Sequence, residues 1–363
     1  MSEEQNAGAV AYQFDISGEF LEAIPYGSGH INDTYRVTFL ENGTAHCYIL
    51  QRINHNIFKK PVALMENIQR VTAHLATQVA NKPDWKRRAL TLIPARDGRA
   101  WHVDAKGYHW RAYRFIEKAR TYDAVETKEQ AFQAAKAFGR FQELLAGLPA
   151  PRLHDTIPDF HNTPKRFKAL QAAIAADAVG RAGLAKAEIE FALAHESITG
   201  VLLDANLPER VTHNDTKFNN VMLDDDTGEA ICVIDLDTVM PGLAPYDFGD
   251  MVRTTTSPAM EDERDLSKVH LQFPMFEALV RGYLSSAGGF LTKREKELLA
   301  FSGKLITFEI GIRFLTDFLA GDTYFKVHRD GHNLDRCRTQ FKLVESIEQQ
   351  EESMNRLVES IVS

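Results

Sequence analysis

Residues 212–220, THNDTKFNN, place an aspartate two residues after a histidine and five residues before an asparagine. A core segment has no use for so many polar groups, because each would need a hydrogen-bonding partner once buried. A carboxylate in such a loop can orient a hydroxyl group and take its proton. We therefore take Asp215 as a candidate catalytic base and expect His213 to brace the loop by hydrogen bonding.

Two short apolar runs follow, residues 221–223 and 230–234, on either side of a polar turn that ends in Gly228. This pattern is typical of a β-hairpin. Asn220 stands directly before the first run and Asp235 directly after the second, so an antiparallel hairpin returns both to the same end. An amide oxygen and a carboxylate suit a hard cation such as Mg²⁺. The spacing predicts Asn220 and Asp235 as metal ligands.

These parts fit phosphoryl transfer from a nucleotide, which needs a metal ion at the phosphates and a carboxylate at the acceptor hydroxyl. A literal Asp-Phe-Gly at residues 247–249 offers a competing metal ligand, but no hairpin returns it to Asn220. We expect Asp247 instead to cap the helix that begins near it, or to hold the 212–220 loop by hydrogen bonds.

The elements that must position these residues fall into two groups. Residues 20–24, 34–40 and 47–53 have the composition of strands, with the turn sequence ENGT between the last two. Residues 62–75 repeat apolar side chains at helical spacing, and 89–95 and 108–117 are further strand candidates. The first part of the chain therefore reads as strands with one helix.

From Thr127 onward helical patterns dominate. The Thr127 hydroxyl can accept from backbone N–H groups at a helix start, and Glu129 complements the helix dipole. The last helix is long and amphipathic, with one apolar side: Leu343, Ile347, Met354, Leu357 and Ile361. The sequence thus predicts an α+β fold, with a β-rich nucleotide-binding lobe over 1–117 and a mostly helical lobe with the catalytic loop over 118–363.

Composition narrows the class of protein. The 363 residues carry a formal charge of −8, which argues against a nucleic-acid binder with a basic stripe. The N-terminal segment lacks an apolar signal region, and no apolar run is long enough for a bilayer. The three cysteines show neither disulfide parity nor metal spacing. We expect a cytoplasmic protein with small-molecule partners and without a membrane or nucleic-acid partner.

Two further segments bear on ligands. Gly27 and Gly29 lie in the loop 27–32 between strand candidates, where glycines let backbone N–H groups approach phosphates closely. Near the C-terminus, Glu309 and Arg313 lie one helical turn apart in an apolar helix, the spacing of an intrahelical ion pair. That pair is either purely structural, or it steadies Arg313 as it reaches into an acceptor pocket.

The motifs together resemble a known group. Residues 212–220 and 233–250 are similar to the signature of the aminoglycoside phosphotransferase (APH) superfamily, small-molecule relatives of protein kinases. With GSGHINDTY, YILQRIN and EIGIRFLTDFLAGDTYF, the resemblance covers nearly the whole chain and is strongest to bacterial N-acetylhexosamine 1-kinases. It implies a bilobal protein-kinase-like fold and ATP- and Mg²⁺-dependent phosphorylation of the anomeric C1 hydroxyl of GlcNAc or GalNAc.

The resemblance also implies residue roles. The sugar-side set is His30, Asp215, Arg253, Arg313 and Tyr324. The nucleotide-side set comprises the loop residues Gly27, Gly29 and Asn32, the strand residue Gln51, and the segment Phe115, Ile116 and Glu117. In that last segment backbone groups would bind the adenine.

A lysine that the resemblance predicts on the third strand is missing. Gln51 occupies its position and could hydrogen-bond a phosphate, but it brings no charge. Arg52 follows and points to the opposite face of a regular strand. Lys217 is our candidate for a replacement contact with the γ-phosphate. Glu66, on the following helix, is either the usual partner of such a cation or a solvated helix charge.

Two alternatives stay open. The same fold could act on another hydroxyl acceptor: a plain hexose, an aminoglycoside, choline or homoserine. A cationic acceptor would want extra carboxylates, whereas Arg313 favours a neutral polyol. The other alternative is a nucleotide-binding pseudokinase, which only the substitution at Gln51 supports.

Overall fold

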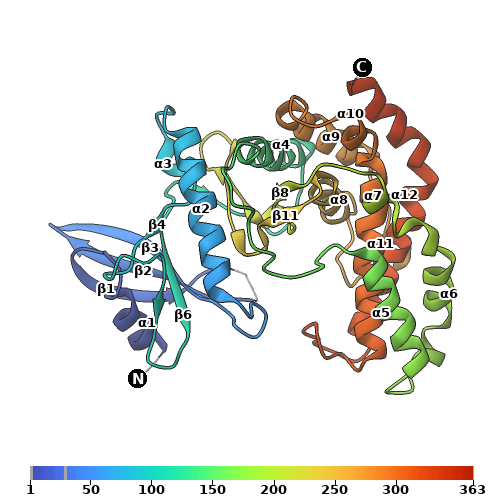
Figure 1. Ribbon diagram of the computed structural model, residues 1–363, viewed down its shortest axis with the longest axis horizontal. Helices are drawn as coiled ribbons and strands as arrows, with labels where there is room; N and C mark the ends of the chain where they lie inside the picture. The colour runs from blue at the N-terminus through green and yellow to red at the C-terminus, as the bar shows by residue number, and fades with distance from the viewer. Residues whose placement is uncertain (1–2, 28–30, 363) are drawn as a thin grey trace. The chain divides into compact units, whose positions relative to one another are not determined.

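The computed structural model describes residues 3–27 and 31–362 (Figure 1). The chain forms two compact units. The first comprises residues 1–120, 147–157 and 222–240, and the second comprises 121–146, 158–221 and 241–363. The first long segment thus ends close to the expected lobe boundary at residue 117. Residues 222–240 join the first unit because their strands share a sheet with residues 119–120.

An antiparallel sheet forms most of the first unit. Its strands are β1 (Glu19–Pro25), β2 (Asp33–Glu41), β3 (Thr44–Arg52), β4 (Leu92–Ile93), β5 (His102–Val103) and β6 (His109–Arg114). Their order is β1-β2-β3-β6-β4, and β5 pairs with β6. Asn42 and Gly43 have φ angles of 50° and 78°, the left-handed values of a two-residue hairpin turn, so the predicted ENGT turn forms. Of the strand predicted over 89–95, only β4 forms.

The helices of this unit are α1 (Glu3–Ala11), α2 (Pro61–Val79) and α3 (Trp85–Arg88). The predicted apolar stripe of α2 is buried at Met65, Ile68 and Val71, but Val62 in its first turn is 42% exposed. The sheet core contains Val37, Phe39, Leu50, Trp110 and Ala112, all of them buried. Burial of alternate strand residues accounts for this core.

The predicted hairpin is present. β9 (Val221–Asp224) and β10 (Ala230–Val233) are neighbours in a sheet of order β10-β9-β7, where β7 is Ala119–Arg120. The Asp224 amide donates to the Glu229 carbonyl at 2.9 Å, and Gly228 has a φ of 70° in the connecting turn. Asn220, the last residue of the 3₁₀ helix η3 (Phe218–Asn220), directly precedes β9.

The second unit is mainly helical, as predicted. Its helices are α4 (Lys128–Leu145), α5 (Thr163–Ala176), α6 (Lys186–Ala194), α7 (Val201–Asp204), α8 (Ala244–Thr255), α9 (Phe273–Ala287), α10 (Lys293–Glu297), α11 (Leu299–Leu319) and α12 (His332–Val362). Short 3₁₀ turns lie at Ala182–Leu184, Glu196–Ile198 and Leu266–Lys268, and β8 (Arg210–Thr212) pairs with β11 (Met240–Gly242). Thr127 caps α4 as expected, but its capping-box partner is Gln130.

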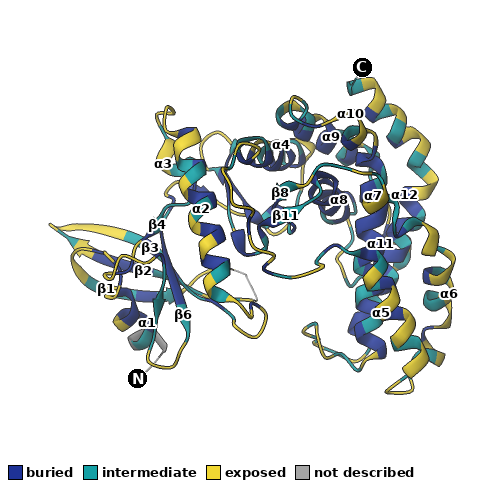
Figure 2. Ribbon diagram, viewed as in Figure 1, coloured by how far each residue is buried: buried dark blue, intermediate teal, exposed yellow. Residues whose placement is uncertain are grey.

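Helices α8 and α11 form the centre of this unit and are dark blue over most of their length in Figure 2. They approach closely at Gly249, where an added Cβ would lie 2.4 Å from the Ser302 carbonyl oxygen. Only glycine fits such a distance.

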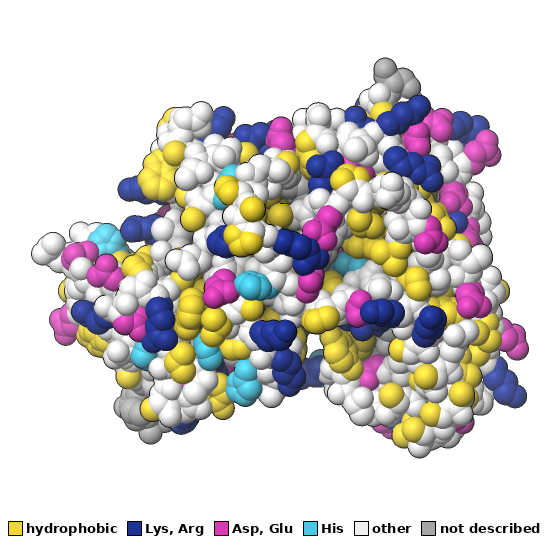
Figure 3. Space-filling view, viewed as in Figure 1, with side chains coloured by type: hydrophobic (Ala, Val, Ile, Leu, Met, Phe, Trp, Pro, Cys, Tyr) yellow, Lys and Arg dark blue, Asp and Glu magenta, His cyan; other side chains and the backbone are white. Residues whose placement is uncertain are grey.

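The surface in Figure 3 carries basic and acidic side chains interspersed over the face shown, without a continuous basic stripe. Across residues 3–27 and 31–362, no helix combines the length and apolar character that a membrane span requires.

Candidate active site

The segment after β8 is held by a buried carboxylate of α8. Asp247, on α8, accepts from the backbone amides of His213 at 2.8 Å and Asn214 at 2.7 Å. Gln142, on α4, donates its Nε2 to the same carboxylate at 2.6 Å. Burial raises the pKa of Asp247 above its ordinary value. Asp247 was expected either to cap a helix or to hold the 212–220 loop. These bonds match the second role, and α8 begins three residues before Asp247.

A second aspartate of α8 fixes the next turn of the loop. Asp250 accepts from the Thr216 amide at 2.8 Å, and the Thr216 hydroxyl donates to the Asp247 carbonyl at 2.6 Å. His213 is fully buried, and its ring lies edge-on to Phe138 and Phe141 of α4 at 5.3 and 5.7 Å. The backbone on both sides of Asp215 is therefore anchored in the core of the helical unit.

Two other predicted site residues, Lys217 and Asn220, contact Asp215. Lys217 Nζ lies 2.9 Å from Asp215 Oδ1, and Asn220 Nδ2 donates to the Asp215 carbonyl at 2.8 Å and to Oδ2 at 3.2 Å. Burial alone would raise the pKa of Asp215, but the charge and hydrogen bond of Lys217, together with the charges of His213 and Arg253, lower that pKa below its ordinary value. The charge of Asp215 in turn raises the pKa of Lys217. The carboxylate is thus held ionised, as a base requires.

Asp235 follows β10 and has a left-handed backbone with a φ of 57°. A non-glycine residue in this region is strained, and such strain occurs preferentially at functional positions. Asp235 is an exposed residue. Asn220 uses only its amide nitrogen in the hydrogen bonds within the described chain, which leaves its oxygen for a ligand. Both residues offer the hard oxygen donors that fit Mg²⁺.

On the nucleotide side, Gln51 belongs to a row of side chains across three strands. It pairs in register with Thr34 of β2 and Arg111 of β6. Gln51 Nε2 donates to Thr34 Oγ1 at 3.0 Å, and Arg111 Nε donates to Gln51 Oε1 at 2.9 Å. Arg111 also forms an ion pair with Asp237, in the turn after β10. A buried arginine therefore lies beside the residue that replaces the expected lysine.

The glycine-rich loop is described in part. Gly27 has a φ of 83°, a conformation that favours glycine. Gly29 and His30 lie outside the described residues. Asn32, at the end of the loop, donates its Nδ2 to Asp237 Oδ2 at 2.6 Å and accepts from the Asn54 amide at 3.0 Å. Its side chain thus ties the loop to the turn after β10.

Two other charged candidates on this side are engaged elsewhere. Arg52 donates its Nε to Asp33 Oδ2 at 2.6 Å and lies over the Tyr108 ring at 4.8 Å. Regular pairing of β2 and β3 places it on the face opposite to Gln51, as expected. Glu66 Oε2 lies 2.7 Å from His154 Nε2, and 48% of its side chain is exposed, so of the two alternatives it is the solvated helix charge and not the partner of a strand-3 cation.

The segment predicted to bind adenine follows β6. Among its backbone groups, the Phe115 amide donates to the Cys47 carbonyl at 3.3 Å, and the Glu117 carbonyl accepts from Arg87 at 3.1 Å. Ile116 is buried between them.

The expected ion pair between Glu309 and Arg313 does not form in the described structure. Glu309 is fully buried, and its carboxylate instead accepts from Thr163 Oγ1 at 2.6 Å and lies 2.9 Å from His161 Nδ1. The Arg313 guanidinium lies over the rings of three aromatic residues at 5.4–5.9 Å: Phe160, Tyr324 and Phe325. The prediction of this ion pair was wrong because Glu309 has closer partners in His161, just before α5, and in Thr163, the first residue of α5.

Tyr324 lies in a turn organised by Asp317 of α11. The Asp317 carboxylate accepts from the amides of Thr323 and Tyr324 at 2.8 Å and of Phe325 at 2.9 Å. The Tyr324 side chain itself is 65% exposed and therefore open to a ligand. The predicted sugar-side residues Arg313 and Tyr324 are thus brought together.

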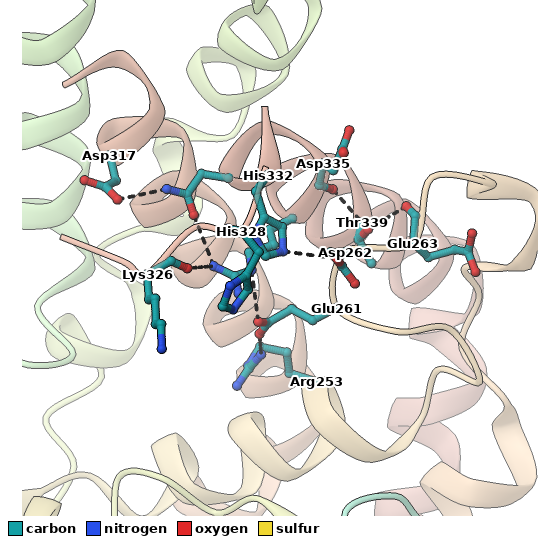
Figure 4. Close-up of polar contacts among 12 residues, drawn as sticks. Arg253, Glu261, Asp262, Glu263, Asp317, Lys326, His328, His332, Asp335 and Thr339 are labelled. Carbon is teal, nitrogen blue, oxygen red and sulfur yellow. Dashed lines mark hydrogen bonds and ion pairs between the residues drawn. The ribbon is translucent and has the colours of Figure 1, made fainter. Parts of the chain in front are cut away.

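Arg253 lies in a different ionic network. Its guanidinium bonds to Asp250 at 2.9 Å and to Glu261 at 3.0 Å, and only 7% of its side chain is exposed. Figure 4 shows the contact between Arg253 and Glu261 beside the contact between His332 and Asp262. Through Asp250, Arg253 supports the loop that carries Asp215.

Comparison with known proteins agrees with this geometry. A family model described as the phosphotransferase enzyme family, APH, matches residues 22–274. The chain belongs to this family. It is therefore a phosphotransferase, and its β-rich and helical units are the two lobes of the APH fold, as the sequence predicted.

Solved structures show the same fold. An aminoglycoside phosphotransferase from Alicyclobacillus acidocaldarius is 12% identical, with a TM-score of 0.64 and coverage of 97% of this chain and 96% of that one. A microcompartment-associated aminopropanol kinase is 18% identical, with a TM-score of 0.58 and coverage of 97% and 98%. A spectinomycin phosphotransferase solved with ADP and spectinomycin is 14% identical, with a TM-score of 0.59 and coverage of 96% and 99%.

Sequence reasoning missed several residues that support the candidate site residues within each unit. Asp250 and Asp317 organise the loops that carry Asp215 and Tyr324, and Arg111 and Asp237 form the ion pair beside Gln51. The second aspartate of the run Ile-Asp-Leu-Asp was a visible signal for Asp237. No such signal pointed to Arg111, because the alternation of a strand does not show which of its residues forms a buried ion pair.

Proposed function

We propose that this APH-family protein transfers the γ-phosphoryl group of ATP to the anomeric C1 hydroxyl of an N-acetylhexosamine, GlcNAc or GalNAc. The product would be the sugar 1-phosphate. The observation that carries the proposal is the Asp215 carboxylate, which Lys217 holds ionised on a backbone anchored by Asp247 and Asp250. Such a fixed carboxylate orients a hydroxyl for attack and takes its proton.

The roles of the neighbouring residues follow from their contacts. Asn220 bonds to Asp215 through its amide nitrogen, and this orients its oxygen away from the base. Asn220 and Asp235 would hold Mg²⁺, which neutralises phosphate charge when bound. Lys217 would contact the γ-phosphate from its position beside Asp215.

On the nucleotide side, the loop 27–32 would cover the phosphates with backbone N–H groups. Gln51 would contribute hydrogen bonds, and the backbone around Ile116 would bind the adenine. The hydrogen bonds that tie Asn32 and Gln51 into one network support a preorganised phosphate site.

The acceptor class is inferred from two arginines near Tyr324. Within the described chain neither Arg313 nor Arg166 forms an ion pair, and the Arg166 Nε is buried without a hydrogen-bonding partner. Burial, followed by the charge of Arg313, lowers the pKa of Arg166. Two neighbouring arginine cations, neither of them in a direct ion pair, disfavour an ammonium group and favour an acceptor with carbonyl and hydroxyl oxygens. An N-acetylhexosamine has these groups, whereas choline and aminoglycosides carry cations.

The test is an ADP-release assay over a panel of acceptors with MgATP. We expect turnover with GlcNAc or GalNAc, much weaker turnover with glucosamine, whose amine is cationic, and none with choline. The 1-O-methyl glycosides are the matched controls, because they lack only the proposed nucleophile. Equal turnover of methylated and free sugars would exclude the anomeric hydroxyl, and faster turnover of glucosamine would exclude the proposed role of the arginines.

A further inference from the structure

The strand that should carry a phosphate-binding lysine carries Gln51, and no lysine or arginine takes its place on that strand. Arg52 is paired with Asp33 on the opposite face of β3. Within the described first unit, the cation nearest in register to Gln51 is Arg111, its direct partner across β3 and β6. The positive charge on this face of the sheet is therefore supplied by Arg111 of β6, the strand next to β3.

Arg111 has contacts that a surface arginine lacks. Its side chain is 1% exposed and its partner Asp237 is 4% exposed, so both charges are desolvated. Burial would lower the pKa of Arg111, but the charges of Asp237 and, more weakly, Asp235 raise it. An arginine buried in this way stays ionised and cannot be removed without leaving Asp237 uncompensated.

The Arg111–Asp237 pair connects three parts of the predicted nucleotide site. Asp237 accepts from Asn32 of the glycine-rich loop, and its backbone carbonyl accepts from Thr156 Oγ1 at 3.3 Å. Arg111 donates to Gln51 on β3. Asp235, the proposed metal ligand, lies two residues before Asp237 and has the strained backbone described above. The turn after β10 is thus anchored to the sheet through Arg111.

We propose that Arg111 is a positioning residue for the magnesium-nucleotide site and replaces, from β6, the missing lysine of β3. This inference rests on the proposed function only in that the ligand is a magnesium nucleotide. Since Arg111 is buried, it acts through Asp237, which fixes the turn that presents Asp235, and through Gln51. A lysine of the usual kind would instead contact the phosphates itself.

The test compares nucleotide binding by calorimetry for the wild type, Arg111→Met and Arg111→Lys, each with MgATP and with ATP in EDTA. Removal of a residue that orients a metal ligand typically weakens metal-dependent binding by about 10- to 100-fold. We expect this loss for Arg111→Met with MgATP, a much smaller loss with Mg-free ATP, and partial recovery in Arg111→Lys. The matched control is Arg52→Met, which also removes one positive charge, from the residue after Gln51 on β3. This variant should leave the affinities for MgATP and for Mg-free ATP unchanged.

Three outcomes would overturn the inference: unchanged MgATP affinity in Arg111→Met, an equal loss with and without Mg²⁺, or an equal loss in Arg52→Met. If Arg111→Met does not fold, the double variant Arg111→Met with Asp237→Asn removes both buried charges together, which proteins tolerate better. This variant should still lose the magnesium-dependent part of binding. If the wild type binds MgATP but phosphorylates no N-acetylhexosamine, the proposed acceptor is disproved. The comparison of the Arg111 variants would still test the inference, because it measures only nucleotide binding.

Discussion

Lys217 Nζ and Asp215 Oδ1 lie 2.9 Å apart, so the proposed base and its nearest cation form an ion pair. The pair is partly accessible, with 45% of the lysine and 26% of the aspartate side chain exposed. An acceptor hydroxyl can therefore reach the carboxylate while the lysine keeps it ionised. The same lysine can meet an incoming phosphate oxygen on its open side.

The ion pair predicts a pH dependence. Because Lys217 helps to lower the pKa of Asp215 below its ordinary value of 3.8, the midpoint of the loss of kcat/KM through protonation of this base should lie below that pH. Lys217→Met removes the opposite charge and should raise the pKa of Asp215. The acid limb of the kcat/KM profile should then move to higher pH. An unchanged acid limb would show that Lys217 does not control the ionisation of Asp215.

Asp215→Asn keeps the size of the side chain and removes the base. We expect kcat to fall by about 10²- to 10⁴-fold, the usual contribution of general base catalysis. The affinity for MgATP should stay close to that of the wild type, because the proposed metal ligands are intact. Steady-state kinetics and nucleotide titration measure the two quantities, and undiminished turnover would disprove the role of Asp215.

Asp247→Asn tests the anchor of the catalytic loop. The carboxylate accepts from two amides and from Gln142, and an asparagine would turn an NH₂ group toward at least one of these donors. We expect a destabilisation of about 1–3 kcal/mol in urea unfolding, the cost of an unsatisfied buried polar group. kcat should fall more than the affinity for nucleotide changes. A variant with normal kcat would show that loop position does not limit the reaction.

Gly249→Ala tests the contact between α8 and α11. The added methyl group would lie 2.4 Å from the Ser302 carbonyl and 2.7 Å from Ile306 Cγ1. Overpacking of this kind costs about 1–3 kcal/mol. Gly289→Ala is the matched control, since a Cβ at that position meets nothing within 4 Å. Equal unfolding midpoints for the two variants would contradict the close approach.

Glu309 predicts a pH-dependent stability. Burial would raise the pKa of this carboxyl, but His161, Arg313 and Thr163 together lower it below its ordinary value of 4.5. A carboxyl with a lowered pKa in the folded state contributes stability above its unfolded pKa and loses it as the pH falls through the folded pKa. The difference in unfolding free energy between wild type and Glu309→Gln should be constant near neutral pH and shrink below 4.5. Urea unfolding across this range measures it, and a pH-independent difference would show that the charge of Glu309 is not involved.

Much of this architecture follows from local patterns. Alternation and turn residues predicted β1, β2, β3 and the β9–β10 hairpin, and the motif around Asp215 predicted the loop that Asp247 holds. The partner of Glu309 could not be predicted in the same way. Helical spacing offered Arg313, but His161 and Thr163 come from a segment distant in sequence, and only tertiary packing brings them to Glu309.

Arg111 illustrates the same limit for a strand. Its sequence neighbourhood predicted a strand, but the buried ion pair with Asp237 depends on the register of β6 against β3. Register is set by the whole sheet and not by the residues of one strand.

Helix α11 carries Glu309, Arg313 and Asp317, and it meets α8 at Gly249, two residues after the aspartate that anchors the catalytic loop. A substitution that shifts α11 would therefore disturb catalysis together with acceptor binding. The turn at residues 321–325 has less of this constraint at Tyr324, because Asp317 holds the backbone amide of that residue while its side chain is 65% exposed. Evolution toward new acceptors in this lineage is expected to proceed through that turn, while the two helices stay nearly unchanged.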